Sequence, residues 1–407
     1  MGGYGRRYWT ERNPASRRRK YPRFRGKEAV DVVVIGGGLT GCMAAAVLAS
    51  DGASVVLLEA ERLADAGTAA GLGLILPEPD AAFRSAESNA GRRPSRTAWE
   101  EARRSALDLA AALRRWSIRS DLKPSSLAIN APTQDAAAIL KKEQQARKDA
   151  GLDAPWLAPA AARAEIGSDS AGAIRLRDAF TIDPVRTALG LAAVAERKGA
   201  RIFERSAVRR TRFTRKHADV VLSSGSIRAR LIVVATGAPG ALFSQLRRHV
   251  RTLDGYAVVT EPLSAIMRRE TGRHASAMTE AGDTRPWLRW LPDDRVLFAG
   301  AAAPPVGPRL RDKTVVHRTA QLMYELSLRH PVISGLPAAW GWRVPLTFTP
   351  DGLPWIGGHR NYPFHFFALA FGWHGESLAW MAAKAAARHL KGEARPSDDR
   401  LGFARYL

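Results

Sequence analysis

Cysteine is almost absent from this chain of 407 residues, because Cys42 is the only one. A disulfide within the chain is therefore excluded, and the composition fits a reducing compartment. The sequence also lacks any run of about 20 apolar residues, so we expect no membrane span. We interpret Cys42 as a small apolar residue at the start of a helix. Together these absences favour a cytoplasmic location.

Residue patterns for two kinds of catalysis are missing as well. The nine histidines show no metal-ligand spacing with cysteines or acids, so we predict no metal site. No Ser-His-Asp arrangement is recognisable either. The sequence therefore gives no support to metal-assisted or nucleophilic catalysis.

Acidic residues are scarce relative to basic ones. The 39 Asp and Glu residues face 62 Lys and Arg residues, which gives a net charge of +23. Part of the excess lies in the first 27 residues, where ten basic residues accompany Glu11 alone. We interpret residues 1–28 as an extended, solvated basic arm. The alternative is a surface that attracts anionic substrates, membranes or nucleic acid.

A glycine-rich turn between two apolar runs is the most informative feature that is present. Residues 30–59 read VDVVVIGGGLTGCMAAAVLASDGASVVLLE, which predicts a strand, a helix and a second strand. Gly36, Gly38 and Gly41 form the G-x-G-x-x-G pattern that places a pyrophosphate at a helix N-terminus. Glu59 ends the second strand, where a carboxylate accepts hydrogen bonds from ribose hydroxyls. The unit predicts an adenine-dinucleotide site; the alternative is a glycine-rich turn in an ordinary α/β fold.

Further elements follow from apolar periodicity along the chain. Helices are predicted at 96–116, 133–150, 185–198, 315–329 and 378–390. Strands are predicted at 127–130, 201–212, 218–223, 226–235, 256–260, 287–291, 296–299 and 364–370.

The choice between FAD and NAD rests on a second copy of the motif, which the chain lacks. A flavin enzyme reduced by NAD(P)H usually needs two dinucleotide sites, so electrons here are expected to come from the substrate. Residues 371–377 read FGWHGES and precede the helix at 378–390. A helix N-terminus aimed at a flavin stabilises the negative charge of its reduced form. FAD is therefore favoured.

Five motifs in this order resemble the D-amino-acid oxidase (DAO) family of FAD-dependent oxidoreductases. This family includes glycine and sarcosine oxidases and γ-glutamylputrescine-type amine oxidases. The motifs are the Rossmann unit with Glu59, then AGTAAGLG at 66–73, VVATG at 233–237, DGLPWIG at 351–357 and GWHG at 372–375. The resemblance covers about residues 29–395.

The resemblance implies an α/β fold with two interleaved domains. One is a Rossmann-like FAD-binding domain of the glutathione-reductase type, at 29–80, 170–240 and 335–395. The other is an α+β substrate domain on a mixed sheet, at 81–169 and 241–334. It also implies oxidation of a C–N bond in a small amine or amino acid by hydride transfer to flavin N5, followed by imine hydrolysis. Oxygen or another acceptor then takes the electrons.

The site residues are carried over from the family's motifs. The predicted cofactor-binding residues are Gly36, Gly37, Gly38, Leu39, Thr40, Gly41, Glu59, Ala60, Thr68, Gly71, Leu72, Val208, Ala235, Thr236, Gly237, Asp351, Gly352, Pro354, Gly372, Trp373, His374 and Gly375. The predicted catalytic or substrate-binding residues are His374, Arg343, Tyr256 and Arg289.

Alternatives stay open for several of these residues. Arg343 lies near where some members bind a carboxylate, or it is a strand arginine paired to an acid. His374 sits above the flavin face, or it caps a helix without touching substrate. Trp373 walls the pocket, or it packs in the core. Arg289 and Tyr256 are further pocket candidates.

The family's covalent flavin attachments need a cysteine or histidine that this sequence lacks at the matching places, so we predict non-covalent FAD. Two other functions are also compatible with the sequence. One is a flavin enzyme acting on an amino-acid-like group of modified tRNA, with the basic arm contacting phosphates. The other is a flavin-binding subunit without catalytic activity. The sequence does not indicate the oligomeric state.

Overall fold

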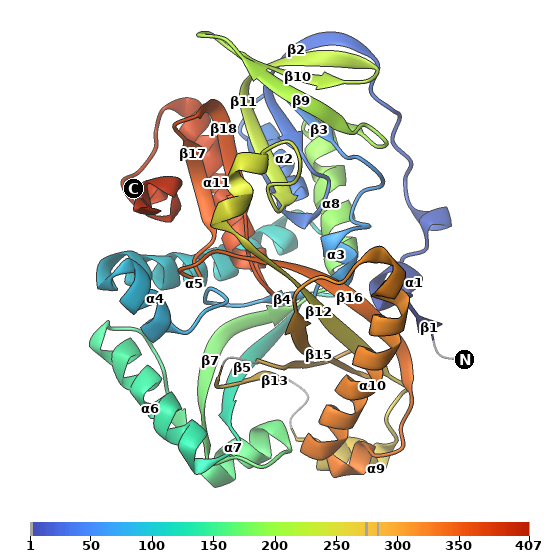
Figure 1. The fold of residues 1–407 in the computed structure, drawn as a ribbon, viewed down its shortest axis with the longest axis vertical. Helices are drawn as coiled ribbons and strands as arrows, with labels where there is room; N and C mark the ends of the chain where they lie inside the picture. The colour runs from blue at the N-terminus through green and yellow to red at the C-terminus, as the bar shows by residue number, and fades with distance from the viewer. Residues whose placement is uncertain (1–2, 273–275, 283–284, 407) are drawn as a thin grey trace.

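The computed structural model describes residues 3–272, 276–282 and 285–406. These residues form two sheets, one above the other in Figure 1, with helices packed on their faces. Each sheet draws its strands from distant parts of the sequence, so the chain passes between the two several times. No helix among the described residues is long and apolar enough to cross a membrane.

The upper sheet in Figure 1 has eight strands around β2 (Gly26–Ile35), in the order β17-β18-β11-β2-β3-β8. From β18 to β8 the strands run parallel, and β9 and β10 extend β11 as an antiparallel ribbon. The four residues Val32–Ile35 are buried, as expected for a parallel strand with both faces covered. The other strands are β3 (Val55–Leu58), β8 (Arg201–Phe203), β9 (Val208–Phe213), β10 (Ala218–Leu222), β11 (Gly225–Gly237), β17 (Trp355–His359) and β18 (Tyr362–Leu369).

The lower sheet has ten strands and is mixed. Its order is β1-β16-β12-β15-β14-β13-β5-β7-β4, with β6 beside β7. Most pairs are antiparallel, but β1 with β16 and β13 with β5 are parallel. The strands are β1 (Gly3–Tyr4), β4 (Leu74–Ile75), β5 (Lys123–Ala131), β6 (Trp156–Leu157), β7 (Gly172–Thr181), β12 (Arg251–Thr260), β13 (Ser276–Glu280), β14 (Trp287–Trp290), β15 (Val296–Ala303) and β16 (Ala338–Phe348).

Helices cover both sheets and lie mostly where periodicity predicts them. Asp183 and Thr133 cap α8 and α6 through their side chains. The helices are α1 (Tyr8–Arg12), α2 (Leu39–Ser50), α3 (Gly67–Ala70), α4 (Phe83–Ala90), α5 (Arg92–Arg115), α6 (Gln134–Asp149), α7 (Pro159–Ile166), α8 (Pro184–Arg197), α9 (Ala265–Glu270), α10 (Arg311–Arg329) and α11 (Glu376–Lys391).

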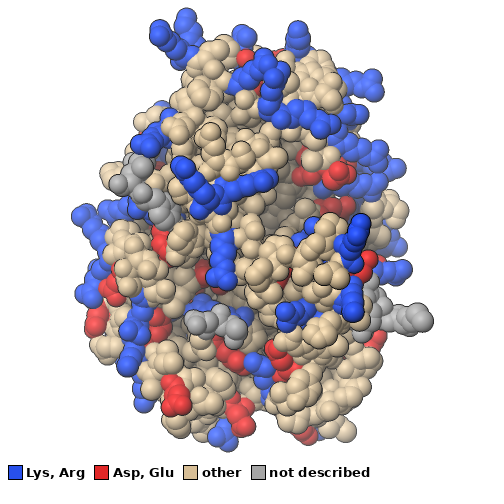
Figure 2. Space-filling model, viewed as in Figure 1, with Lys and Arg blue, Asp and Glu red and all other residues tan. Residues whose placement is uncertain are grey.

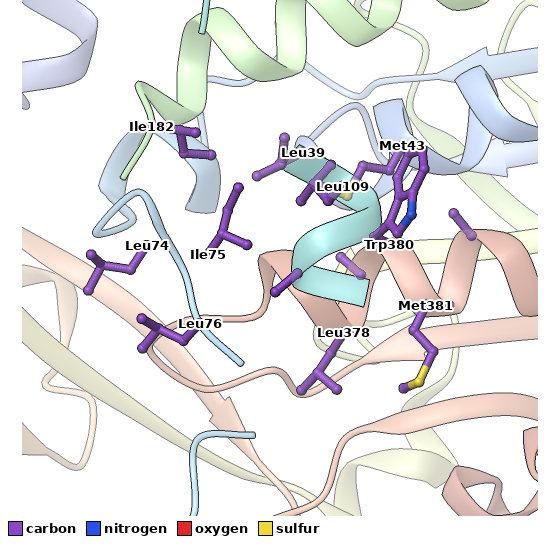
Figure 3. Packing of buried hydrophobic residues seen from close by; sticks show 14 of the residues in the cluster. Leu39, Met43, Leu74, Ile75, Leu76, Leu109, Ile182, Leu378, Trp380 and Met381 are labelled. Carbon is purple, nitrogen blue, oxygen red and sulfur yellow. The ribbon is translucent and has the colours of Figure 1, made fainter. Parts of the chain in front are cut away.

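A continuous apolar core joins three helices beneath the glycine-rich turn. Figure 3 shows Leu39 and Met43 of α2 beside Leu109 of α5 and Trp380 of α11. Cys42 is fully buried in the same cluster, as expected for an apolar role. Burying these side chains fixes the N-terminal ends of α2 and α11 relative to the upper sheet.

The prediction of a solvated N-terminal arm is wrong. Residues of α1 enter the core, where Tyr8 and Trp9 are each 1% exposed. β1 adds a short parallel strand to β16. The sequence pointed to a solvated arm because of its charge, but the two aromatic side chains bury enough apolar surface to hold the segment in place.

The predicted strand at 201–212 is also wrong as a single element. β8 ends at Phe203, and Arg205 has a φ of 51°, which a regular strand does not allow. β8 pairs with β3, whereas β9 leaves the sheet to pair with β10.

The domain bounds remain a prediction. β7 and β16 lie in the ten-stranded sheet, although residues 170–240 and 335–395 are assigned to the FAD-binding domain by the sequence.

Candidate active site

A cavity of about 500 Å³ lies where the parallel strands of the upper sheet end. Its walls come from the carboxyl ends of β2, β3 and β11, from the segment 66–71 and from the start of α11. Val344, Pro345 and Thr347 of β16 close it from the lower sheet. In open α/β sheets, ligands bind at this carboxyl edge, so the cavity is where the fold places a nucleotide.

Two glycines shape the floor of the cavity. Gly36 has a φ of 109°, and a Cβ there would lie 2.5 Å from the carbonyl oxygen of Ala235. A Cβ at Gly41 would lie 1.8 Å from the carbonyl oxygen of Gly36. The close packing brings the N-terminus of α2, which Gly38 caps, against the turn after β2. Its free N–H groups therefore face the cavity, and they suit a pyrophosphate.

Glu59 stands at the end of β3 with its carboxylate fixed in place. One oxygen accepts a hydrogen bond from the backbone N–H of Gly37 at 2.6 Å, and the other accepts from Glu61 at 2.8 Å. Glu59 and Ala60 line the cavity, and Val208 lies on its wall as well. A carboxylate held in this way is placed to accept from ribose hydroxyls of a dinucleotide.

The segment around Thr68 is held by three side-chain hydrogen bonds. The Thr68 hydroxyl accepts from the backbone N–H of Leu39 at 2.8 Å. The indole of Trp9 donates to the carbonyl oxygen of Gly71 at 2.9 Å, and that of Trp342 donates to Ala70 at 3.1 Å. Sequence reasoning missed both tryptophans, because only the tertiary fold brings residues so distant in sequence onto this segment.

The other end of the cavity is formed by the turn before α11. Phe371, Gly372, Trp373 and Gly375 line it, and that this turn faces a flavin stays a prediction. The backbone N–H of Trp373 donates to Asp80 at 2.7 Å. Burial raises the pKa of Asp80 to about 6, even though this hydrogen bond favours its charged form. Asp80 thus anchors the turn, a role that no motif in the sequence indicates.

His374 points away from the cavity lining. It is 2% exposed, its ring lies 4.9 Å from that of Trp287, and its Nε2 is 3.7 Å from an oxygen of Asp80. Burial lowers the pKa of His374 to about 3, so its imidazole is neutral at physiological pH. The side chain therefore packs against the lower sheet behind the turn.

Asp351 and its neighbours form a separate turn between β16 and β17. The Asp351 carboxylate accepts from Thr349 at 2.9 Å and from Arg405 at 2.6 Å. Gly352 has a φ of 75°, which fits a tight turn. Neither these two residues nor Pro354 is among the residues that line the cavity.

Arg343 and Tyr256 lie opposite each other on β16 and β12. Arg343 forms an ion pair with buried Asp254, with 2.7 Å between nitrogen and oxygen. Tyr256 packs in the cluster that includes Leu322 of α10, on the other side of the lower sheet. Neither side chain is among those that line the cavity.

Arg289 is buried between the cavity and the lower sheet. Its Nη1 donates to the carbonyl oxygens of Leu72, Gly73 and Ile182 at 2.6–3.0 Å. The guanidinium also lies over the ring of Trp9, 5.3 Å from its centre. Burial lowers the pKa of Arg289 to about 10. Its Nη1 group thus holds the segment that borders the cavity, while its buried Nε has no hydrogen-bond partner among the described residues.

Most, but not all, of the predicted cofactor residues meet in this one cavity. Those that line it are Gly36, Gly38, Leu39, Thr40, Glu59, Ala60, Thr68, Gly71, Val208, Ala235, Thr236, Gly237, Gly372, Trp373 and Gly375. Those that do not are Gly37, Gly41, Leu72, Asp351, Gly352, Pro354 and His374. Gly37 and Gly41 shape the turn from beneath, since Gly37 donates to Glu59 and Gly41 packs on Gly36.

Sequence reasoning missed the ionisable group at the α11 end of the cavity. Glu376 begins α11, lines the cavity and is 8% exposed. Burial raises the pKa of its carboxyl to about 7. The sequence showed only an acid at a helix start, a common surface arrangement, so its burial could not be foreseen.

Curated relatives match nearly the whole chain at low identity. The chain is 24% identical over 371 residues to γ-glutamylputrescine oxidoreductase of Escherichia coli, covering 90% of this chain and 85% of that protein. It is 22% identical over 393 residues to the probable oxidoreductase OrdL of Haemophilus influenzae, covering 94% and 87%.

Solved structures share the fold. Glycine oxidase of Geobacillus kaustophilus superposes with a TM-score of 0.77 at 19% identity, covering 93% of this chain and 99% of that one. L-Proline dehydrogenase of P. horikoshii gives 0.74 at 18% identity, covering 93% and 98%. The predicted Rossmann-like domain with an interleaved domain on a mixed sheet is thereby confirmed.

A family model described as "DAO: FAD dependent oxidoreductase" matches residues 31–389. The match spans both sheets and every segment that lines the cavity. The glycine floor, the fixed Glu59 carboxylate and the helix start at the far end fit FAD, and the prediction of this cofactor is confirmed. The chain belongs to the DAO family of FAD-dependent oxidoreductases.

Proposed function

We propose that the protein oxidises the C–N bond of a small amine, with FAD held non-covalently in the cavity. Bound FAD supplies a hydride acceptor for the α-carbon of the substrate. The observation that carries the proposal is the cavity itself. It offers glycine-lined backbone, apolar walls and a helix start, but no nucleophile–base pair among its described lining residues. Hydride transfer needs placement and charge control more than such a pair.

The named activities of similar proteins support an amine or amino acid as the substrate. They are γ-glutamylputrescine oxidoreductase, glycine oxidase and L-proline dehydrogenase, and each of these names specifies a compound with a C–N bond. The alternative of a tRNA-borne group gains no comparable support from these comparisons.

The arginines favour an amine over an α-amino acid. Arg343 is ion-paired with Asp254, and Arg289 donates to three carbonyl oxygens. The residues that line the cavity include no Lys or Arg among those described. A substrate carboxylate would therefore find no ready cation there, and we propose that Arg343 serves the stability of the lower sheet instead.

The test is a panel of compounds added to the yellow holoenzyme without oxygen. We expect primary or secondary amines without a carboxylate next to the nitrogen to bleach the flavin absorbance faster than glycine, sarcosine or proline. Air should then restore the colour, or an artificial acceptor should do so if the enzyme does not react with oxygen. Bleaching by dithionite but by none of the amines and amino acids would overturn the proposal.

The mode of FAD attachment is tested on the same preparation. Denaturation in acid followed by filtration is expected to separate free flavin from the polypeptide. Yellow colour that stays with the precipitated chain would contradict non-covalent binding.

A further inference from the structure

The cavity contains little charge, and what it has is negative. Among the described residues that line it, Glu59 and Glu376 are the ionisable ones. Glu59 belongs to the end where β3 stops, beside Gly37. Glu376 belongs to the opposite end, in the turn with Gly372 and Trp373 that the sequence assigns to the flavin. A carboxyl group therefore shares the flavin end of the cavity, without a lining cation to balance it.

The Glu376 carboxylate accepts hydrogen bonds from backbone N–H groups at the start of α11 and from a neighbouring segment. One of its oxygens accepts from the backbone N–H of Gly375 at 2.9 Å. The backbone N–H groups of Glu376 itself and of Leu74 also favour the charged form. The start of α11 was expected to stabilise negative charge on a reduced flavin through such groups. The carboxylate of Glu376, the first residue of α11, already accepts some of these hydrogen bonds.

Charged neighbours offset the burial of this carboxylate only in part. Arg289 acts on Glu376 from β14, but its Nη1 donors serve three carbonyl oxygens, and Asp183 and Tyr8 also act on Arg289. On the turn before α11, His374 stays neutral because burial lowers its pKa to about 3.

Other acids and bases lie one layer further away. Asp80 is tied to the backbone N–H of Trp373, and Glu78 is bound by Arg147. Arg12 acts on Arg289 from α1, in opposition to the acids around it.

Reduction of the flavin adds negative charge at this end of the cavity. Two electrons and one proton at N5 leave the ring with a net negative charge, and a second charge on Glu376 would then share a poorly solvated space. We propose that Glu376 binds a proton when the flavin is reduced and releases it on reoxidation. Two-electron reduction thus takes up two protons, one at N5 and one at the Glu376 carboxylate. The second proton comes from the substrate ammonium or from solvent.

The inference deepens the proposed function but depends only on FAD occupancy. The flavin is reduced with dithionite in the presence of reference dyes, so no substrate is needed. A two-electron potential shifts by about 30 mV per pH unit for each proton taken up. Burial raises the pKa of Glu376 to about 7, so the carboxyl is mostly ionised above pH 7.5 before reduction. The proposal requires it to be protonated after reduction, so we expect a slope near 60 mV per pH unit from pH 7.5 to 9 in the wild-type holoenzyme.

Glu376→Gln keeps the side-chain shape and the hydrogen bond from Gly375 but binds no proton. Its expected slope is about 30 mV per pH unit over the same range, with a less negative potential than wild type above pH 7.5. Glu393→Gln, an exposed change just after α11, should behave as wild type. Equal slopes in wild type and Glu376→Gln would overturn the proposal, whichever compounds reduce the flavin.

A second measurement covers the case in which Glu376→Gln retains too little FAD. The infrared difference spectrum of the wild-type holoenzyme, reduced minus oxidised at pH 8, should show a new protonated-carboxyl band. That band should shift on transfer to D₂O. A spectrum without such a band would also reject the proton at Glu376. A failed amine panel leaves both readouts unchanged, so the two proposals fail separately.

Discussion

At Gly41 the backbone leaves room for a hydrogen atom and nothing larger. The contact with the Gly36 carbonyl oxygen is what lets α2 start directly after the turn from β2. A pyrophosphate needs that approach, since the free N–H groups of the first helical turn must reach it. The residue therefore acts through the position of a helix and does not itself line the cavity.

Gly41→Ala is expected to abolish retention of FAD during purification and to lower the unfolding temperature. The added methyl group would meet backbone oxygen at 1.8 Å, so α2 must move away from the turn. The ratio of flavin absorbance to protein measures the effect. Gly307→Ala is the matched control, because a Cβ there meets nothing within 4 Å. Normal flavin content in Gly41→Ala would show that the helix position matters less than the contacts indicate.

Individual residues also show what the sequence can and cannot predict. Gly36 and Glu59 were identifiable because their roles depend on spacing within one βαβ unit. Asp80, Trp9 and Glu376 were not, because each acts through a partner brought close only by the tertiary fold. The sequence singled out Arg343 as a possible strand arginine paired to an acid. The identity of that acid, Asp254, depends on the register between β16 and β12.

The N-terminal segment is the element that departs most from expectation. α1 is short, yet Trp9 contacts both the carbonyl of Gly71 and the guanidinium of Arg289. Trp9 therefore stabilises the segment 66–71, which lines the cavity. A short helix has too few residues to show a clear apolar periodicity. The basic residues of this segment therefore led to the prediction of a solvated arm.

Trp9→Phe is expected to weaken FAD binding several-fold while leaving the fold intact. Phenylalanine keeps most of the apolar contact but removes the hydrogen bond to Gly71, which is worth roughly 1 kcal/mol. Titration of the apoprotein with FAD, followed by quenching of flavin fluorescence, gives the change. Trp99→Phe is the control, since its buried indole N–H has no hydrogen-bond partner among the described residues. Equal FAD affinities in the two variants would show that the hydrogen bond from Trp9 does not contribute to FAD binding.

At the scale of the whole molecule, charge is concentrated at the surface and buried ionisable groups are mostly neutral or paired. Figure 2 shows Lys and Arg side chains over much of this face, densest toward the top, where Figure 1 places β9 and β10.

Inside the molecule, burial lowers the pKa of His330 and of His365 to about 4. Histidines kept neutral in the folded state favour unfolding once the pH falls below their ordinary values.

His365→Gln is expected to flatten the dependence of stability on pH. The folded-state pKa of His365, about 4, lies below the ordinary value of 6.5. The contribution of neutral His365 to the free energy of unfolding is therefore complete above pH 6.5. As the pH falls toward 4, this contribution is lost, which lowers the free energy of unfolding by roughly 3 kcal/mol. Urea unfolding at pH 7 and pH 4.5 measures the difference, with exposed His317→Gln as the control. A pH dependence equal to that of wild type would show that His365 is protonated without cost in the folded state.

The pairing of the first strand with a late one has a consequence for synthesis of the chain. β1 pairs with Trp340 and Gly341, and β18 completes the upper sheet from residues 362–369. A nascent chain that ends before residue 338 has neither β16, which closes the cavity from the lower sheet, nor α11, whose start forms its other end. The complete cavity therefore forms only after residues 338–391 have been synthesised, and until then Tyr8 lacks its ring contact with Trp340.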